Sequence, residues 1–245
     1  MGGRGGIDAD GRDVRVRIAP IDPEFERALA LLDDVVRRDG ELTARDKSVL
    51  LVAAAAVRDR EAVVAEVAAA QALGVPDDEL RAVALALYLS RGAGPCRTVL
   101  DAVDATGDPP APPDGAGVSD VTVDEILDEF RAVFGEVPDR VDLLRMHSVA
   151  GLEAYHRIRR SVLRDGRLEP VVAELALVAV NAAEHRGDFA EVHARGARLA
   201  GATEAQLVEA GLCAIPSGGV AAWLAASNAI VATRSSPPRP GSNPR

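Results

Sequence analysis

Aromatic residues are scarce in this sequence. They make up only 3% of its 245 residues, while alanine, valine and leucine dominate. Aromatic residues are enriched in strands, whereas alanine and leucine are among the strongest helix formers. The composition therefore favours closely packed helices over a sandwich or barrel, and the chain is long enough to bury a core in one large domain or two smaller ones.

Basic charge and long apolar runs are lacking as well. Lys47 is the only lysine beside 27 dispersed arginines, and the net charge is −10. Without a basic field, we do not expect nucleic acid as a partner. No apolar run is long enough to span a bilayer, and the N-terminus has no hydrophobic signal core. We therefore expect a soluble, cytoplasmic protein that does not bind membranes.

Cysteine and cofactor motifs are equally sparse. The two cysteines, Cys96 and Cys213, lie far apart in segments of small residues, where we expect reduced, buried thiols. The HExxH spacing of a zinc site, a GxSxG elbow and a glycine-rich loop after a strand are all absent from the sequence. The sequence thus predicts neither a metal site nor a bound cofactor.

Two helical segments, residues 20–105 and 121–234, make up most of the chain. Apolar residues recur at helical spacing within both, and glycine or proline ends successive helices. Between them, residues 106–120 hold four prolines and three glycines. Such a composition predicts a semi-extended linker rather than a regular element.

The two ends of the chain have little apolar patterning. Residues 1–19 are rich in glycine, aspartate and arginine, and residues 235–245 are rich in proline and serine. Such segments bury too little apolar surface to order themselves, so we predict disordered tails. Within the first tail, Val14–Ile18 alternates enough to fit a short strand.

The two helical segments repeat one another. Gly74–Leu80 lines up with Gly201–Leu207, and Asp39–Leu42 lines up with Asp165–Leu168. The offset is 126 residues at the start and 127 later. Self-similarity at a nearly fixed offset indicates a duplicated structural unit. The sequence therefore predicts an all-α fold built by tandem duplication of one helical unit.

The clearest candidate site lies in residues 168–201, which predict a helix, a tight polar turn and a second helix. Glu174, Asn181 and His185 share one face of the first helix, because they are spaced i, i+7 and i+11. His193 in the second helix faces back toward the first if the two pack antiparallel. Polar groups on one stripe of an otherwise apolar helix indicate a functional site.

This stretch resembles the carboxymuconolactone decarboxylase and AhpD-like superfamily, whose fold is all-helical. The redox branch of that family carries a glutamate, a CxxC motif twelve residues later, and a histidine four residues after the second cysteine. Those places hold Glu174, Arg186, Phe189 and His193 here, so both cysteines are missing. Arg186 and Asp188 ahead of His193 are instead similar to the RxD…H arrangement of the decarboxylase branch.

The resemblance implies a cofactor-independent lyase or isomerase that acts on a small carboxylated or lactone-bearing metabolite. His193 would move a proton at carbon, Glu174 would orient the imidazole, and Arg186 would bind an anionic group. Ser48 and Glu66 stand in the first repeat where the second has the glutamate and the histidine. The first repeat is therefore expected to lack this chemistry.

Three further residues complete the predicted site. Asn181 and His185 near the end of the first helix, and Trp223 in the last helix of the chain, are expected to bind the substrate. Asn181 also fits a bond between helices, and Trp223 also fits a core or subunit contact. His147 and His156 are nine residues apart on one helix, hence on opposite faces, and are interpreted as structural.

A second function remains open on the sequence alone. A duplicated fold without its cysteines could be a non-catalytic ligand-binding or scaffold protein. An enclosed pocket at Glu174 and His193 would favour the enzyme, whereas solid packing against core side chains would favour the alternative. Members of the resembled family form rings, so we also expect a homo-oligomer, either a trimer or a dimer.

Overall fold

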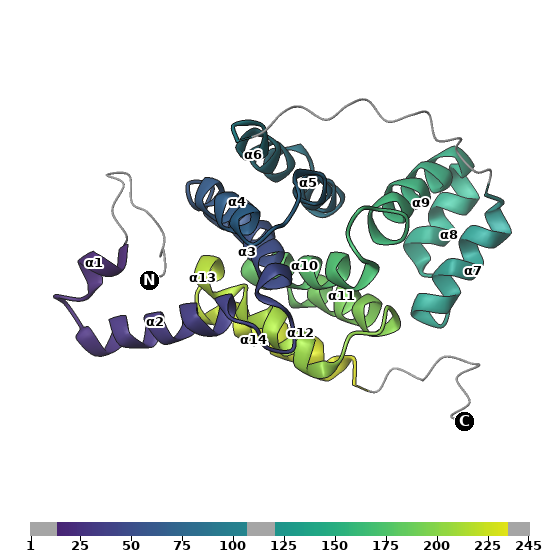
Figure 1. The fold of residues 1–245 in the computed structure, drawn as a ribbon. Helices are drawn as coiled ribbons and strands as arrows, with labels where there is room; N and C mark the ends of the chain where they lie inside the picture. Colours follow the sequence, from purple (N-terminus) through teal and green to yellow (C-terminus); the bar gives the residue numbers. More distant parts are fainter. Residues whose placement is uncertain (1–13, 107–120, 235–245) are drawn as a thin grey trace, which may run out of the picture.

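The protein is a bundle of helices in its computed structural model, which describes residues 14–106 and 121–234 (Figure 1). The first half contains α1 (Val14–Ile18), α2 (Pro23–Arg37), α3 (Ala44–Arg58), α4 (Ala62–Ala72), α5 (Asp77–Arg91) and α6 (Ala93–Asp104). The second half contains α7 (Val123–Phe134), α8 (Asp139–His147), α9 (Val149–Leu163), α10 (Pro170–Ala183), α11 (Gly187–Leu199), α12 (Glu204–Leu212), α13 (Ile215–Gly218) and α14 (Val220–Ala232). No strand occurs in the two described ranges, so the predicted all-α fold is confirmed.

The duplicated unit is visible in the order of the helices. Helices α2 to α6 correspond to α9 to α14, and the equivalent helices α3 and α10 pack against each other in the middle of the molecule (Figure 1). Ala54 of α3 shares a buried cluster with Ala182 and Ala183 of α10. Small side chains at this contact let two helix backbones come close together, as the alanine-rich composition predicts.

The N-terminal segment differs from the sequence prediction. Val14–Ile18 forms the short helix α1, so its interpretation as a strand is wrong. The backbone N–H groups of Ile21 and Asp22 both donate to the carbonyl oxygen of Ile18, which closes this turn locally. A strand needs a neighbouring strand for its hydrogen bonds, and the described ranges contain none. The disorder predicted for residues 1–19 is also wrong over residues 14–18, which form α1. The predicted disorder of residues 1–13 and 235–245 and the predicted semi-extended linker at residues 107–120 lie outside the described residues.

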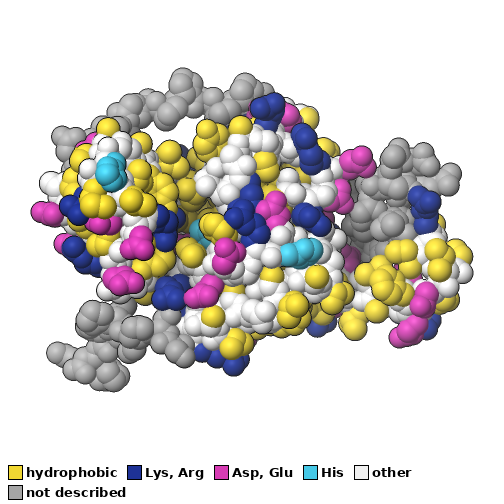
Figure 2. Space-filling model, turned by 180° about the vertical axis from the view of Figure 1, so that it is seen from behind, with side chains coloured by type: hydrophobic (Ala, Val, Ile, Leu, Met, Phe, Trp, Pro, Cys, Tyr) yellow, Lys and Arg dark blue, Asp and Glu magenta, His cyan; other side chains and the backbone are white. Residues whose placement is uncertain are grey.

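Helix α2 extends away from the body of the protein together with α1 (Figure 1). Its C-terminal end is anchored by the buried Val36, while Ile21, Phe25 and Leu31 are exposed. Hydrophobic side chains are correspondingly visible on this arm in the space-filling view (Figure 2). This segment is therefore helical as predicted, but it contacts the core only through its C-terminal half, where Val36 is buried and Leu32 packs against the core.

Helix α10 forms the centre of the second repeat. Pro170 occupies its first turn, where the missing N–H of proline is harmless, and residues 173–183 are all buried. A helix that is apolar on every side is expected to be surrounded by other helices. Glu174 and Asn181 are the two polar side chains of this buried stretch, and each needs a partner.

Helices α7 to α9 form a separate lobe beside the second repeat (Figure 1). A capping box of Thr122 and Glu125 starts α7. Ile126 and Phe130 of α7, Val141 of α8 and Leu152 of α9 then form a small core of their own. Contacts of α7 with both α9 and α11 place this lobe across the start of α10 and the end of α11. No helix in residues 14–106 and 121–234 is long and apolar enough to cross a membrane.

Candidate functional site

Glu174 and His193 form a buried pair between α10 and α11. Nδ1 of His193 lies 2.8 Å from Oε2 of Glu174. The two side chains are only 8% and 6% exposed. Because buried carboxylates and imidazoles are rare without partners, each residue accounts for the burial of the other. The structure thus brings together the two residues that the sequence singled out first.

Gly196 makes room for this pair. It lies on α11 directly against the Glu174 carboxylate, and a Cβ atom at position 196 would stand 2.4 Å from Oε1. That distance is too short for any side chain, so a larger residue would push the carboxylate out of place. Glycine is therefore required at position 196 because the Glu174 side chain comes so close, and not because the backbone needs a special conformation.

The hydrogen bond also fixes the protonation pattern of the histidine. An ionised Glu174 can only accept a hydrogen bond, so His193 carries a proton on Nδ1. Nε2 is then the nitrogen that gains or loses a proton, and it has no hydrogen-bond partner within residues 14–106 and 121–234.

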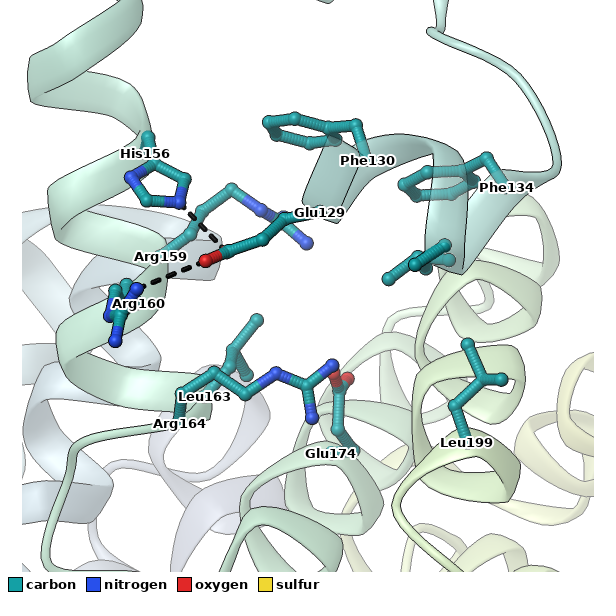
Figure 3. A pocket seen from close by; sticks show the side chains of 12 residues that line it. Glu129, Phe130, Phe134, His156, Arg159, Arg160, Leu163, Arg164, Glu174 and Leu199 are labelled. Carbon is teal, nitrogen blue, oxygen red and sulfur yellow. Dashed lines mark hydrogen bonds and ion pairs between the residues drawn. The ribbon is translucent and has the colours of Figure 1, made fainter. Parts of the chain in front are cut away.

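A cavity of about 430 Å³ lies beside this pair, between the α7–α9 lobe and the ends of α10 and α11 (Figure 3). Glu174 forms part of its wall. The other lining residues are Glu129, Phe130, Ala132, Val133, Phe134, His156, Arg159, Arg160, Leu163, Arg164 and Leu199. Six of these twelve lining residues are apolar and six are charged or histidine, so the cavity is more polar than most small-molecule sites and suits a charged ligand.

The charged groups of the cavity come mainly from α9. Glu129 of α7 is bound by two of its residues: Nε2 of His156 lies 2.8 Å from Oε2, and Nη1 of Arg160 lies 3.0 Å from Oε1. Arg159 lies over the ring of Phe130, 5.6 Å from its centre. The Glu129 carboxylate thus holds His156 and Arg160 in place, and the Phe130 ring holds Arg159.

Arg164 is the remaining cation of the cavity. It follows the last turn of α9, lines the cavity and has no ion-pair partner among residues 14–106 and 121–234 (Figure 3). A guanidinium group offers five N–H donors in a planar fork that matches a carboxylate. Arg164 is therefore available to bind an anionic ligand.

Sequence reasoning missed most of these residues. His156, Arg160 and Arg164 are spaced by four residues along α9, which puts them on one face of a helix and could have indicated a polar surface. Instead His156 was interpreted as structural; it is indeed buried, but it also lines the cavity. Glu129 carries no comparable signal, because only tertiary packing brings α7 to this place.

Asn181 and Arg186 lie elsewhere. The Asn181 side chain bridges Nη2 of Arg91, 2.7 Å from Oδ1, and the carbonyl oxygen of Leu177, 2.7 Å from Nδ2. Exposed Arg186 lies over the ring of Phe189, 4.1 Å from its centre. Asn181 shares a stripe with Glu174 but not a site, because a helix rises about 1.5 Å per residue and position 181 is therefore roughly 10 Å further along α10. Arg186 lies beyond the end of this helix, which is Ala183.

His185 and Trp223 also lie outside the cavity. His185 has a φ of 60° and ends α10 with a backbone turn, and its Nε2 lies 2.8 Å from the carbonyl oxygen of Gly218. Trp223 packs partly buried against Gly211 and the alanine cluster between the repeats. The grouping of these residues with Glu174 into one site is therefore corrected; that they bind a substrate stays a prediction.

Comparison with known proteins identifies the fold. The sequence model of the carboxymuconolactone decarboxylase family matches residues 23–105 and again residues 150–232, one copy in each half of the chain. The chain belongs to the carboxymuconolactone decarboxylase family. Helices α7 and α8 lie outside both matched ranges, so the wall that carries Glu129 is not part of the matched family unit.

A solved structure shows the same fold over nearly the whole chain. It is a crystal structure from Burkholderia xenovorans described as a "putative gamma-carboxymuconolactone decarboxylase subunit". The two share 21% sequence identity with a TM-score of 0.56, over 91% of this chain and 92% of that chain. At this identity the likeness concerns the fold alone. No curated protein matches the chain.

The first carboxymuconolactone decarboxylase unit has no counterpart of the Glu174–His193 pair. Ser48, at the place of Glu174, donates its hydroxyl to the carbonyl oxygen of Arg45 over 2.6 Å. Glu66, at the place of His193, is held by two hydrogen bonds from Arg37 of 2.7 and 3.0 Å. Both polar groups are held by other residues of the first unit.

We expect no thiol-dependent peroxidase activity from this family member. The positions of the family's CxxC motif hold Arg186 and Phe189, and both cysteines of the chain are buried. Burial raises the pKa of the Cys213 thiol to about 12 and also raises the pKa of Cys96. Neither thiol is then a thiolate near neutral pH, and the thiolate is the nucleophile. An assay with an organic hydroperoxide and a dithiol should show no turnover; turnover lost in a Cys96→Ser/Cys213→Ser variant would contradict this.

Proposed function

We propose that this protein is a lyase or isomerase of the carboxymuconolactone decarboxylase family that transfers a proton at a carbon atom of a small carboxylated or lactone-bearing metabolite. No redox thiol and no bound cofactor take part. One observation carries the proposal: the buried Glu174–His193 pair ends in a carboxylate that lines a cavity large enough for such a metabolite. Glu174 borders this cavity, whereas a pair packed on all sides by core side chains would favour a scaffold protein.

Glu174 is the member of the pair that meets the substrate. Its carboxylate lines the cavity and His193 lies behind it, so the roles assigned from the sequence are exchanged. In a decarboxylation, the bond to the departing carboxylate breaks, CO₂ leaves, and the electron pair stays on the substrate carbon. His193, protonated on both ring nitrogens, then passes its Nδ1 proton through Glu174 to that carbon, and a proton from solvent returns His193 to its starting state.

Arg164 takes the part that the sequence gave to Arg186. A carboxylate on the substrate accepts two parallel hydrogen bonds from its guanidinium group, and Arg159 adds positive charge on the same side of the cavity. These contacts fix the orientation of the substrate before the proton moves. The arginine also takes the place of the water molecules that surround the substrate carboxylate in solution.

A non-catalytic ligand-binding protein is the second candidate. The observation that favours it is the position of His193, which does not itself line the cavity. In that case the same arginines would hold the same anionic ligand, and the Glu174–His193 pair would only shape the wall. Both candidate functions predict that an anionic ligand binds, but only the enzyme predicts proton exchange at a carbon atom of that ligand.

The test follows proton transfer at carbon. A panel of small carboxylic acids and lactone acids, γ-carboxymuconolactone among them, is incubated with the protein in D₂O. Deuterium incorporation and loss of CO₂ are followed by NMR. We expect at least one acid to be turned over, and Arg164→Gln to raise its KM roughly tenfold with a smaller effect on kcat.

Arg186→Gln is the matched control, because Arg186 is an exposed arginine outside the cavity. Its KM should equal that of the wild type. The opposite pattern, with KM raised by Arg186→Gln and unchanged in Arg164→Gln, would place the anion site at the turn after α10. Binding of an acid without any exchange or CO₂ release would leave the ligand-binding protein as the function.

A further inference from the structure

Glu129 is a second carboxylate of the cavity, opposite Glu174. It comes from α7, which the family unit does not include. The side chain is 44% exposed, whereas that of Glu174 is 6% exposed, so the two acids occupy the outer and the inner part of the cavity. Figure 3 shows Glu129 held against α9, with the side chains of Arg164 and Glu174 on the other side of the open space.

The contacts of His156 fix which of its ring nitrogens donates. Its Nε2 lies 2.8 Å from Glu129, while its Nδ1 is buried without a hydrogen-bond partner among the described residues. A buried N–H without an acceptor is unfavourable, so the proton belongs on Nε2 and Nδ1 carries only a lone pair. His156 therefore positions Glu129 by donating to it from Nε2.

Glu129 is consequently held as an ionised acceptor. It receives one hydrogen bond from His156 on Oε2 and one from Arg160 on Oε1. An ionised carboxylate accepts about four hydrogen bonds, so roughly two positions remain free.

The free positions suit a neutral donor better than a cation. Arg160, which is shared between Glu129 and Asp165, already lies beside Glu129, and a second positive group would have to come close to that guanidinium. A hydroxyl group, in contrast, needs only an acceptor in the right place. With an anionic group at Arg164 and a hydroxyl at Glu129, a ligand would bridge the cavity from α9 to α7.

We propose that Glu129 is a specificity-determining residue and that the cavity takes small hydroxylated carboxylic acids, with the hydroxyl donating to Glu129. This rests on the proposed function, because it uses the same cavity and the same carboxylate site at Arg164. It narrows the substrate class from small acids in general to hydroxy acids. The added α7 wall is the feature that separates this cavity from one built by the family unit alone.

The test compares malate with succinate, which differ by one hydroxyl group. Binding of each to the full chain is measured by ligand-observed NMR or calorimetry. We expect malate to bind about tenfold more tightly, as a hydrogen bond to a charged acceptor implies. In Glu129→Gln this preference should fall to within about threefold, and succinate affinity should stay unchanged.

Asp128→Asn is the matched control: Asp128 neighbours Glu129 on α7, is paired with Arg131 and does not line the cavity. It should keep the full preference for malate. Equal binding of the two acids by the wild type, or an unchanged preference in Glu129→Gln, would overturn the proposal while the carboxylate site at Arg164 stands. If neither acid binds, the hydroxy-acid assignment is wrong, and the proton-exchange panel still decides separately whether the protein is an acid–base enzyme.

Discussion

Glu174→Gln is expected to lower the rate of proton transfer by about 10²- to 10⁴-fold, the usual loss when a positioned acid or base is removed. Glutamine has nearly the same shape, so the cavity and Gly196 can accommodate it. It cannot carry the proton, however, and an amide leaves His193 without an anionic partner. The rate is measured as deuterium incorporation into the acid that the wild type turns over best.

His193→Ala should cause a loss of similar size, because the two residues act as one unit. The double variant should then be no slower than either single variant. Ser48→Ala provides the control in the first repeat, where serine stands at the place of Glu174 and only donates to the Arg45 carbonyl oxygen. Its rate should stay within a few-fold of the wild type. A folded Glu174→Gln protein with an unchanged rate would rule out the pair as the proton carrier.

The fold and the central pair could be predicted because their signals are local. Helical periodicity, capping residues and the offset of 126 to 127 residues define helices and the duplication within short windows of sequence. The Glu174–His193 contact joins residues 19 positions apart in one hairpin, so two helices and a turn suffice to bring them together. Residues that the helical pattern places on the facing sides of such a hairpin are therefore also in contact in the folded protein.

The cavity could not be predicted because it depends on long-range packing. Glu129 binds His156, which lies 27 positions further along the chain. It lines the same cavity as Glu174 only because α7 contacts both α9 and α11. Arg186 illustrates the opposite error: the motif placed it correctly in the turn, but it is separated from Glu174 by the length of α10. Helical periodicity predicts on which face of a helix a residue lies, but not how far apart two residues lie along the helix axis.

Lys47 shows how composition hides a structural role. The sequence offered it only as a single lysine among many arginines, but it is 1% exposed in the folded protein. Its Nζ donates to the carbonyl oxygens of Val35 and Arg38 at the end of α2, at 3.2 and 3.0 Å. It also lies 3.1 Å from Oε2 of Glu209 on α12, so it connects the two repeats.

Lys47→Met should destabilise the protein by about 3 kcal/mol, since breaking a buried ion pair leaves Glu209 and two carbonyl groups without their donor. For a chain of this size, the melting temperature should fall by about 6–12 °C. Arg27→Gln is the control: it breaks an exposed pair with Glu24 and should change the stability by less than about 1 kcal/mol. Both are measured by urea unfolding and by thermal scans.

The partner of Lys47 adds a pH dependence to this prediction. Burial would raise the pKa of Glu209, but hydrogen bonds from the Leu42 backbone N–H and from Lys47 outweigh it and hold this pKa below its usual value. A carboxyl group with a lowered folded-state pKa stabilises the protein above its unfolded-state pKa, about 4.3, and loses this contribution as the pH falls through the folded-state value. The stability difference between wild type and Glu209→Gln should therefore be largest near pH 7 and shrink below pH of about 4. A difference that grows on acidification, or a Lys47→Met protein as stable as the wild type, would show that the contact between the repeats does not depend on this ion pair.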